Sequence, residues 1–219
     1  MRYLDYCWLV MGKSPEPGKV KTRMQPHLSP EMSANLQAAL SCDVLQRWQL
    51  ANLCPLRFWL GGNADVFQKK VLQDIEGDFP ISPQVVGDLG QRMSAAITHA
   101  FDNGSQGVIV TGTDCPFMDT CYIEQALLSL EQGIDIVVGP AMDGGYVLIG
   151  MNRLYPEVFQ NISWGGEHVF TQTRQAIEAL NLKALYLPML PDIDHPEDLS
   201  RLGQCQSEVL QEFALLAPK

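Results

Sequence analysis

The run Gly107-Val-Ile-Val-Thr-Gly-Thr-Asp-Cys-Pro116 decides the fold class of the chain. It opens with a short β-branched stretch between two glycines, which is typical of a strand buried inside a sheet. Asp114 follows this stretch closely, and a carboxylate at the end of a buried strand is costly unless a partner neutralises it. The run therefore predicts a central strand with a functional loop at its carboxyl end.

Strands and helices alternate on both sides of this run. Such alternation predicts an α/β fold with a mostly parallel central sheet and helices on both faces. Because no repeat or linker divides the chain, we expect residues 1–219 to form a single domain. The predicted strands are residues 6–11, 56–60, 84–86, 107–112, 135–138, 146–150 and 184–187. One predicted helix begins at Pro30 behind a Ser29 cap. The other predicted helices span residues 64–74, 89–101, 120–130 and 196–216.

Composition excludes several classes of protein. Hydrophobic residues make up 46% of the chain and charged residues 18%, which is enough apolar material for a folded core. The formal net charge of -10 argues against a nucleic-acid partner, since proteins that bind nucleic acids present a basic face. The six cysteines include no CxxC pair, so buried free thiols are expected. No signal peptide or membrane-spanning run is recognisable, so the expected location is the cytoplasm.

A basic loop follows the first predicted strand. Lys13, Lys19, Lys21 and Arg23 all lie in the segment Gly12-Lys-Ser-Pro-Glu-Pro-Gly-Lys-Val-Lys-Thr-Arg23. Lysine and arginine supply charge-assisted donors to phosphate oxygens, and Gly18 permits close approach of the backbone. The spacing is not that of a Walker loop. The loop is interpreted as a phosphate site, with a solvated charged turn as the alternative.

Asp114 is placed to hold Mg²⁺ or Mn²⁺ through its carboxylate, with phosphate oxygens completing the coordination shell. The alternative is that Asp114 caps the turn in front of Pro116. Asp119 is predicted to cap the helix that begins beside it.

Three later segments could join this site. In Pro140-Ala-Met-Asp-Gly-Gly-Tyr146 the glycines permit either ligand contact or a tight turn, and Asp143 and Tyr146 are candidate acceptor contacts. In Asp192-Ile-Asp-His-Pro-Glu-Asp198 the first two aspartates alternate along an extended segment, so one of them can reach the metal held by Asp114. The run Trp164-Gly-Gly-Glu167 could stack a base or a sugar, or could simply precede a helix.

Together these segments resemble a bacterial family of small glycosyltransferase-like proteins with the GT-A, nucleotide-diphospho-sugar transferase fold, a Rossmann-like α/β fold. A more distant resemblance extends to phospholactate guanylyltransferase and the molybdenum-cofactor guanylyltransferases. His195 and the run Gly165–His168 depart from the family's usual residues, and the second departure falls where an acceptor would bind. The resemblance is carried, in the family's order, by the basic loop, Gln84-Val-Val-Gly-Asp-Leu-Gly-Gln-Arg-Met93, Gly112-Thr-Asp-Cys-Pro116, Gly139-Pro-Ala-Met-Asp-Gly-Gly-Tyr-Val-Leu-Ile-Gly150 and Asp192-Ile-Asp-His-Pro-Glu-Asp-Leu199.

The resemblance implies that Lys21 and Arg23 grip phosphates while Asp114 and Asp194 hold the metal, with Asp114, Lys21 and Arg23 as the catalytic set. It also implies that Asp88 and Arg92 lie near the nucleotide. The expected nucleotide- or phosphate-binding residues are Lys13, Pro15, Gly18, Lys21, Arg23, Asp88, Arg92 and Thr113. The expected donor or acceptor loop comprises Asp143, Gly144, Gly145, Tyr146 and Trp164.

Three functions fit this pattern. The first is a metal-dependent transferase that uses a nucleotide-sugar donor, with Mg²⁺ or Mn²⁺ neutralising the leaving diphosphate. The second is a nucleotidyltransferase that joins an NTP to a phosphorylated small-molecule acceptor and releases pyrophosphate, which the basic loop favours because a triphosphate carries more charge. The third is a non-catalytic nucleotide-binding module. The oligomeric state is not predictable from the sequence.

Overall fold

A seven-stranded sheet forms the centre of the protein in the computed structural model, which describes residues 1–73, 75, 77 and 79–218. Its strands are β1 (Tyr6–Lys13), β2 (Leu56–Gly61), β3 (Ile81–Pro83), β4 (Gly107–Thr111), β5 (Ile136–Pro140), β6 (Tyr146–Met151) and β7 (Ala184–Tyr186). They lie in the order β3-β2-β1-β4-β6-β5-β7. Only β6 runs antiparallel to its neighbours, β4 and β5. The predicted mostly parallel sheet is confirmed.

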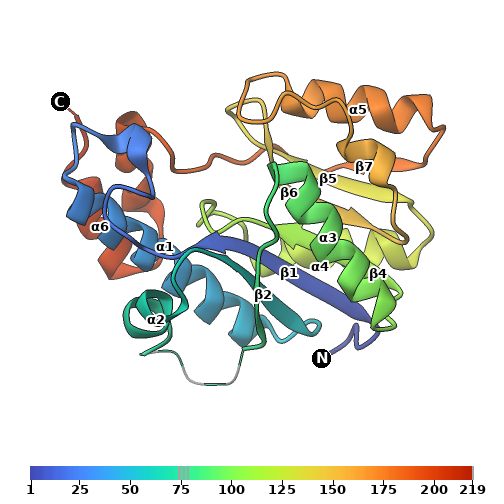
Figure 1. The fold of residues 1–219 in the computed structure, drawn as a ribbon, viewed down its shortest axis with the longest axis horizontal. Coiled ribbons are helices and arrows are strands. Elements are labelled where there is room, and N and C mark those ends of the chain that lie inside the picture. The colour runs from blue at the N-terminus through green and yellow to red at the C-terminus, as the bar shows by residue number, and fades with distance from the viewer. Residues whose placement is uncertain (74, 76, 78, 219) are drawn as a thin grey trace.

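Helices cover both faces of the sheet (Figure 1). The α-helices are α1 (Pro30–Ala51), α2 (Ala64–Phe67), α3 (Leu89–Asp102), α4 (Thr120–Glu131), α5 (Val169–Ala179) and α6 (Glu208–Ala214). The described residues also form three 3-10 helices, η1 (Thr22–Met24), η3 (Pro156–Phe159) and η4 (Pro196–Gln204), and one π-helical turn, η2 (Gln68–Leu72).

Alternate side chains of β1 pack into two different cores, because successive residues of a strand point to opposite faces. Trp8 and Val10 belong to a core that α1 and α4 complete, whereas Leu9 and Met11 belong to one completed by α3 and α5. Figure 1 shows α3 in front of the sheet and α1 behind it. The strand is therefore buried on both faces, as its unbroken apolar run predicts.

A third core lies beside the sheet. It joins η1 and the outer face of α1 to η4 and α6, which lie side by side with α1 at the left of Figure 1. Met24, Leu36, Ile193, Leu199 and Leu202 are all fully buried there. This core attaches the last part of the chain to the basic loop near its beginning.

Two predicted helix starts are confirmed by their caps. The hydroxyl oxygen of Ser29 accepts a hydrogen bond from the backbone N–H of Met32, and Pro30 occupies the first turn of α1. The Asp119 carboxylate accepts from the N–H of Tyr122 at the start of α4. Each cap satisfies one of the backbone donors that a helix leaves unpaired at its N-terminus.

The strand predicted at residues 84–86 is wrong. The strand here is β3, which ends at Pro83, while the Gln84 Nε2 donates to the carbonyls of Gly12 and Trp59 at 3.0 and 2.9 Å. β3 is a three-residue strand at the edge of the sheet, so its apolar pattern is too short to define its register.

The helices predicted at residues 64–74 and 196–216 are each divided. The first becomes α2 followed by the π-helical turn η2, and Asp74 lies outside the described residues. The second becomes η4 and then α6, which restarts behind a Ser207 cap. The break lets Leu202 and Leu210 both reach the third core. Within the described residues, no helix is both long enough and apolar enough to cross a membrane.

Candidate functional site

A pocket of about 600 Å³ opens at the carboxyl ends of β1 and β4. In the sheet, β1 lies between β2 and β4 and is parallel to both. The chain leaves β1 toward β2 and β3 on one side, whereas β4 begins the other side of the sheet, so the loops after β1 and β4 diverge. Such a switch point leaves a crevice where α/β proteins bind ligands. Five segments converge there: the basic loop, residues 111–115, residues 141–147, the run Trp164–Glu167 (the Trp164 loop) and the segment Asp192–Asp194.

Lys21 lies at the centre of the charged half of the pocket. Its ammonium nitrogen is 3.0 Å from Asp114 Oδ2 and 3.9 Å from Asp194 Oδ1, and it donates to the Ile193 carbonyl at 2.6 Å. The side chain is only 2% exposed. Its backbone is left-handed, with φ 48° and ψ 39°, a conformation that costs a non-glycine residue about 1 kcal/mol or more. The surrounding contacts must offset that cost.

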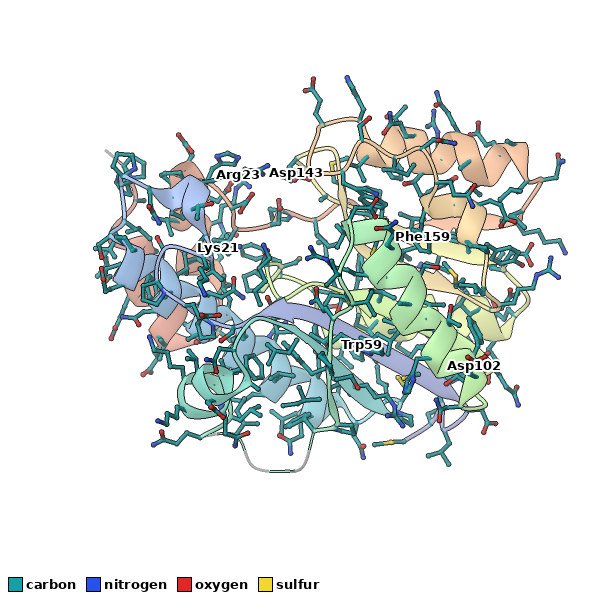
Figure 2. All side chains as sticks on the ribbon, viewed as in Figure 1. Lys21, Arg23, Trp59, Asp102, Asp143 and Phe159 are labelled. Atoms are coloured by element: carbon teal, nitrogen blue, oxygen red, sulfur yellow. The ribbon has the colours of Figure 1, made fainter. Side chains whose placement is uncertain are left out.

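Arg23 connects three parts of the chain. Its guanidinium contacts the Asp194 Oδ2 at 2.6 Å and donates to the Gly165 carbonyl at 3.4 Å. Asp194 is held in turn by its own N–H, which donates to the carboxylate of Asp198. About half of the Arg23 side chain is exposed, so it remains accessible to a ligand (Figure 2).

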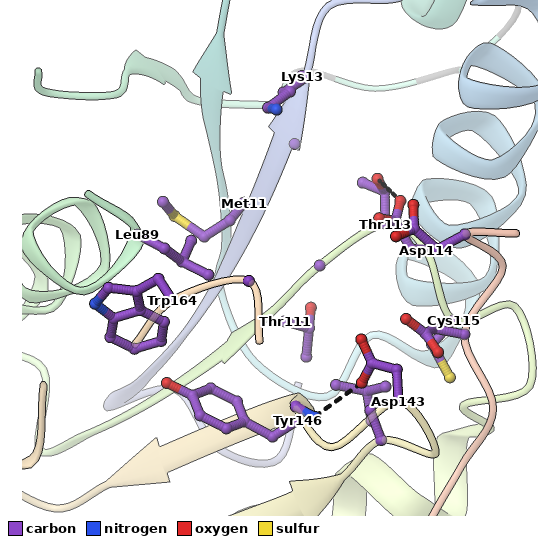
Figure 3. Close-up of a pocket in the computed structure, with 18 of the residues that line it drawn as sticks. Met11, Lys13, Leu89, Thr111, Thr113, Asp114, Cys115, Asp143, Tyr146 and Trp164 are labelled. Atoms are coloured by element: carbon purple, nitrogen blue, oxygen red, sulfur yellow. Dashed lines mark hydrogen bonds between the residues drawn. The ribbon is translucent and has the colours of Figure 1, made fainter. Parts of the chain in front are cut away.

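Asp114 is oriented by a chain of hydrogen bonds. Its Oδ1 accepts from the Thr113 hydroxyl at 3.1 Å (Figure 3), and the Thr113 oxygen accepts from the Gln37 Nε2 at 3.0 Å. Gln37 and Thr113 are both buried, whereas the Asp114 side chain is 46% exposed. One oxygen of Asp114 is thus held by Thr113 and the other by Lys21.

Two further carboxylates line the same side of the pocket. Burial, followed by the neighbouring charge of Asp143, raises the pKa of Asp192 to about 6. Asp143 accepts a hydrogen bond from the N–H of Gly145 at 2.8 Å, which orders the turn before β6 (Figure 3). Four carboxylates therefore line the pocket on the side of Lys21 and Arg23.

The other half of the pocket is apolar (Figure 3). Trp164 packs over Gly90 of α3, where an added Cβ would lie 2.6 Å from the indole Cζ2. The Tyr146 ring meets Trp164 edge to face with centroids 6.4 Å apart, and burial raises the pKa of its hydroxyl. Leu89 and Met11 line the pocket beside Trp164 (Figure 3). A flat ring could pack against this wall.

Most residues of the predicted site line this pocket. The lining contains Lys13, Lys21, Arg23, Arg92, Thr113, Asp114, Asp143, Gly145, Tyr146, Trp164 and Asp194. Pro15, Gly18, Asp88 and Gly144 do not belong to the lining. Asp88 instead forms a capping box with Gln91 at the start of α3. Gly144, at φ +90°, lies against the backbone of Glu167.

Sequence reasoning missed Gln37 and Gln84, which also line the pocket. Gln37 belongs to a stripe of buried polar residues on α1, with Ser33 and Ser41 one turn to either side. Buried polar residues at fourth positions of an otherwise apolar helix face are a signal that the sequence contains. Gln84 carries no comparable signal, because it is the first residue of the strand predicted at residues 84–86.

The donor set fits a hard divalent cation. Asp114 and Asp194 approach each other from the middle and the end of the chain, and both supply the oxygen atoms that Mg²⁺ and Mn²⁺ prefer. Among the described residues, no group of three or more His, Cys, Asp or Glu side chains forms a complete metal cage. Such a pair suits a cation whose remaining ligands are water and phosphate oxygens.

Comparison with known proteins identifies relatives of this chain. The family model described as "Uncharacterized protein conserved in bacteria (DUF2064)" matches residues 44–166. A crystal structure from Desulfovibrio desulfuricans G20, provisionally named a nucleotide-diphospho-sugar transferase, is 33% identical. The match covers 98% of this chain and 97% of that one, with a TM-score of 0.86. Among proteins with curated functions, none matches the chain in sequence.

Two more distant structures share the fold. A cytidylyltransferase from Leptospira borgpetersenii serovar Hardjo-bovis is 13% identical over 98% of this chain and 97% of its own, with a TM-score of 0.59. A Mycobacterium tuberculosis H37Rv protein in complex with manganese is 15% identical over 87% and 92%, with a TM-score of 0.51. The predicted nucleotide-diphospho-sugar transferase fold is confirmed, and the chain belongs to the DUF2064 family.

Proposed function

We propose that residues 1–219 act as one metal-dependent transferase domain that uses a nucleotide-diphosphate-sugar donor. The observation that carries this proposal is the meeting of Lys21 and Arg23 with Asp114 and Asp194 in one pocket at the switch point of the sheet. Cations for phosphate oxygens and carboxylates for a divalent metal are the two parts that a nucleoside diphosphate requires. The 33% identical relative, provisionally named for this class of transferase, supports it.

The charged and apolar halves of the pocket suggest a division of labour. Lys21 and Arg23 would bind the diphosphate and stabilise the negative charge that develops on it as the bond to the transferred group breaks. Asp114 and Asp194 would hold Mg²⁺ or Mn²⁺, which supplies further charge neutralisation when bound. The wall of Trp164 lies on the other side of the pocket, where it would orient the donor or acceptor ring.

Nucleotidyl transfer is the second candidate. The pocket lining contains five cationic side chains, which is enough to cradle a triphosphate. They are Lys13, Lys19, Lys21, Arg23 and Arg92. The products separate the two candidates, because glycosyl transfer releases a nucleoside diphosphate and nucleotidyl transfer releases pyrophosphate. Phosphorus NMR of reaction mixtures distinguishes these species.

The first test is a thermal-shift screen of nucleotide sugars and NTPs, each with Mg²⁺, with Mn²⁺ and with EDTA. A ligand at a hundredfold excess over its Kd should stabilise the protein by about 2.7 kcal/mol. Asp114→Asn should lose the metal-dependent part of that stabilisation and keep its fold, because Asp114 is partly exposed and Lys21 keeps Asp194 and the Ile193 carbonyl as partners.

The matched control is Asp102→Asn, which removes one carboxylate at the exposed end of α3, far from Lys21 and Arg23 (Figure 2). This variant should respond to ligands as the wild type does. Stabilisation that persists undiminished in EDTA would contradict the metal assignment. Binding without turnover across a broad panel of acceptors would favour the non-catalytic nucleotide-binding module.

A further inference from the structure

The four charged groups at the centre of the site already neutralise one another. Lys21 lies between Asp114 and Asp194, and Arg23 contacts the outer oxygen of Asp194. Two cations therefore face two anions at 2.6 to 3.9 Å. The Lys21 ammonium thus contacts both of the carboxylates that would hold a divalent cation.

A ligand of one sign alone would break this balance. An anion that drew Lys21 and Arg23 toward itself would leave Asp114 and Asp194 facing each other without a cation. A divalent cation that took over the carboxylates would leave the Lys21 ammonium, 2% exposed, with only the Ile193 carbonyl as partner. A buried charge that loses its partner is strongly destabilising, so neither exchange is favourable by itself.

We propose that Lys21 and Arg23 exchange partners when the site is filled, leaving the carboxylates for phosphate oxygens only as a divalent cation reaches Asp114 and Asp194. The ligand is then a metal–diphosphate chelate rather than either of its components. This inference rests on the proposed function and deepens it, because it makes metal binding and phosphate binding depend on each other. Such mutual dependence is a coupling free energy between two ligands.

Neutral acceptors beside both cations support the exchange. The Lys21 ammonium makes three contacts, two of them to the carboxylates. The third contact, to the Ile193 carbonyl, involves no charge that the ligand would alter. Arg23 has a comparable second partner in the Gly165 carbonyl. Both cations can therefore change their charged partner and keep one neutral acceptor.

The test uses MnCl₂ and sodium pyrophosphate as probes and measures binding to the full chain by titration calorimetry. Free Mn²⁺ is counted independently by electron paramagnetic resonance. Mn²⁺ alone and pyrophosphate alone, the latter in EDTA, should each bind weakly. The premixed complex should bind at least about tenfold more tightly than either probe, within the usual range of coupling between ligands.

Lys21→Met keeps the length of the side chain and removes the resident cation. It should bind Mn²⁺ alone about tenfold more tightly than the wild type, because the carboxylates then have no cation between them. Pyrophosphate should bind it less tightly. Lys69→Met, a change of the same charge on the exposed turn η2 and outside the pocket, should behave as the wild type.

The outcomes separate the two proposals. If Mn²⁺ alone binds the wild type as tightly as the premixed complex, partner exchange is wrong while the proposed function stands. If Lys21→Met gains no affinity for Mn²⁺, partner exchange is likewise contradicted. If the premixed complex does not bind the wild type at all, the proposed function fails with it. The wild-type titrations decide the matter even if Lys21→Met does not fold.

Discussion

Asp135, the residue just before β5, accepts hydrogen bonds from three residues in two separate segments. The backbone N–H of Lys183 donates to its Oδ2 at 2.9 Å, while the Asn152 amide and the Tyr155 hydroxyl approach its Oδ1. The Lys183 N–H, helped by those two side chains, lowers the pKa of Asp135 below its usual value. The ionised carboxylate is thus favoured in the folded protein over the unfolded one.

Asp135→Asn should therefore destabilise the protein at neutral pH by roughly 1 kcal/mol, the usual contribution of a partly exposed hydrogen bond. The stabilisation by the wild-type carboxylate is complete above its unfolded-state pKa and is lost as the pH falls through its lowered folded-state pKa. Urea unfolding of both proteins between pH 7 and pH 3 measures the difference. A difference that stays constant over this range would rule out the ionised carboxylate as its source.

At the scale of single residues, the sequence predicted the site better than it predicted each residue's contacts. Lys21 and Asp114 converge as expected, because they follow β1 and β4, neighbouring parallel strands whose carboxyl ends lie at one edge of the sheet, and Arg23 and Asp194 join them. The left-handed backbone of Lys21 could not be foreseen, since nothing local favours it. It depends on partners more than ninety residues away.

At the scale of elements, the turn before β6 packs directly against the Trp164 loop and the start of α5. The Gly144 carbonyl accepts from the N–H of Phe170 at 2.8 Å. A Cβ on Gly144 would lie 2.1 Å from the Glu167 carbonyl oxygen, so only glycine fits there. The sequence pattern allowed either ligand contact or a tight turn for this glycine, and the close contact observed is with another loop of the chain.

Gly144→Ala should displace the Trp164 loop and weaken ligand binding. The control is Gly133→Ala, at a similar φ of +87° but with open space around it. Both variants incur the left-handed backbone cost of about 1 kcal/mol, and only Gly144→Ala adds the steric conflict. Scanning calorimetry and ligand titration of the two proteins measure the difference. Equal behaviour of the pair would show that the two loops are not coupled.

Elements with strong local signals were predicted well, and weakly marked ones were not. The strands β1 and β4 are buried apolar runs, and their predicted positions match to within two residues. A helix after the run Trp164–Glu167 was only one of two alternatives and had no predicted bounds, although the buried Val169, Thr173 and Ile177 of α5 recur at every fourth position. The central threonine interrupts the apolar stripe and hid the pattern. The split between η4 and α6 follows from the shape of the third core, which no local pattern encodes.

At the scale of the whole molecule, the third core links the site to stability. Leu199→Ala and Leu127→Ala each remove a fully buried side chain, from the third core and from the core behind the sheet respectively. Both should lower the free energy of unfolding by about 2–5 kcal/mol. Urea unfolding measures this loss.

Only Leu199→Ala should also weaken ligand binding in the folded protein. Leu199 shares the third core with Ile193, which lies between Asp192 and Asp194 in the sequence. Titration with the premixed manganese and pyrophosphate, at a temperature where both variants are folded, makes the comparison. Similar affinities in the two variants would mean that the third core does not position the site.

The contacts of Lys21 with Ile193 and of Arg23 with Asp194 join residues 172 and 171 positions apart in the chain. A chain is synthesised from its N-terminus, and a domain generally folds as a unit. The strands β1 to β7 leave the ribosome before the aspartate that completes the pocket. A nascent chain therefore lacks a complete site for the proposed metal–phosphate ligand until Asp194 has been synthesised.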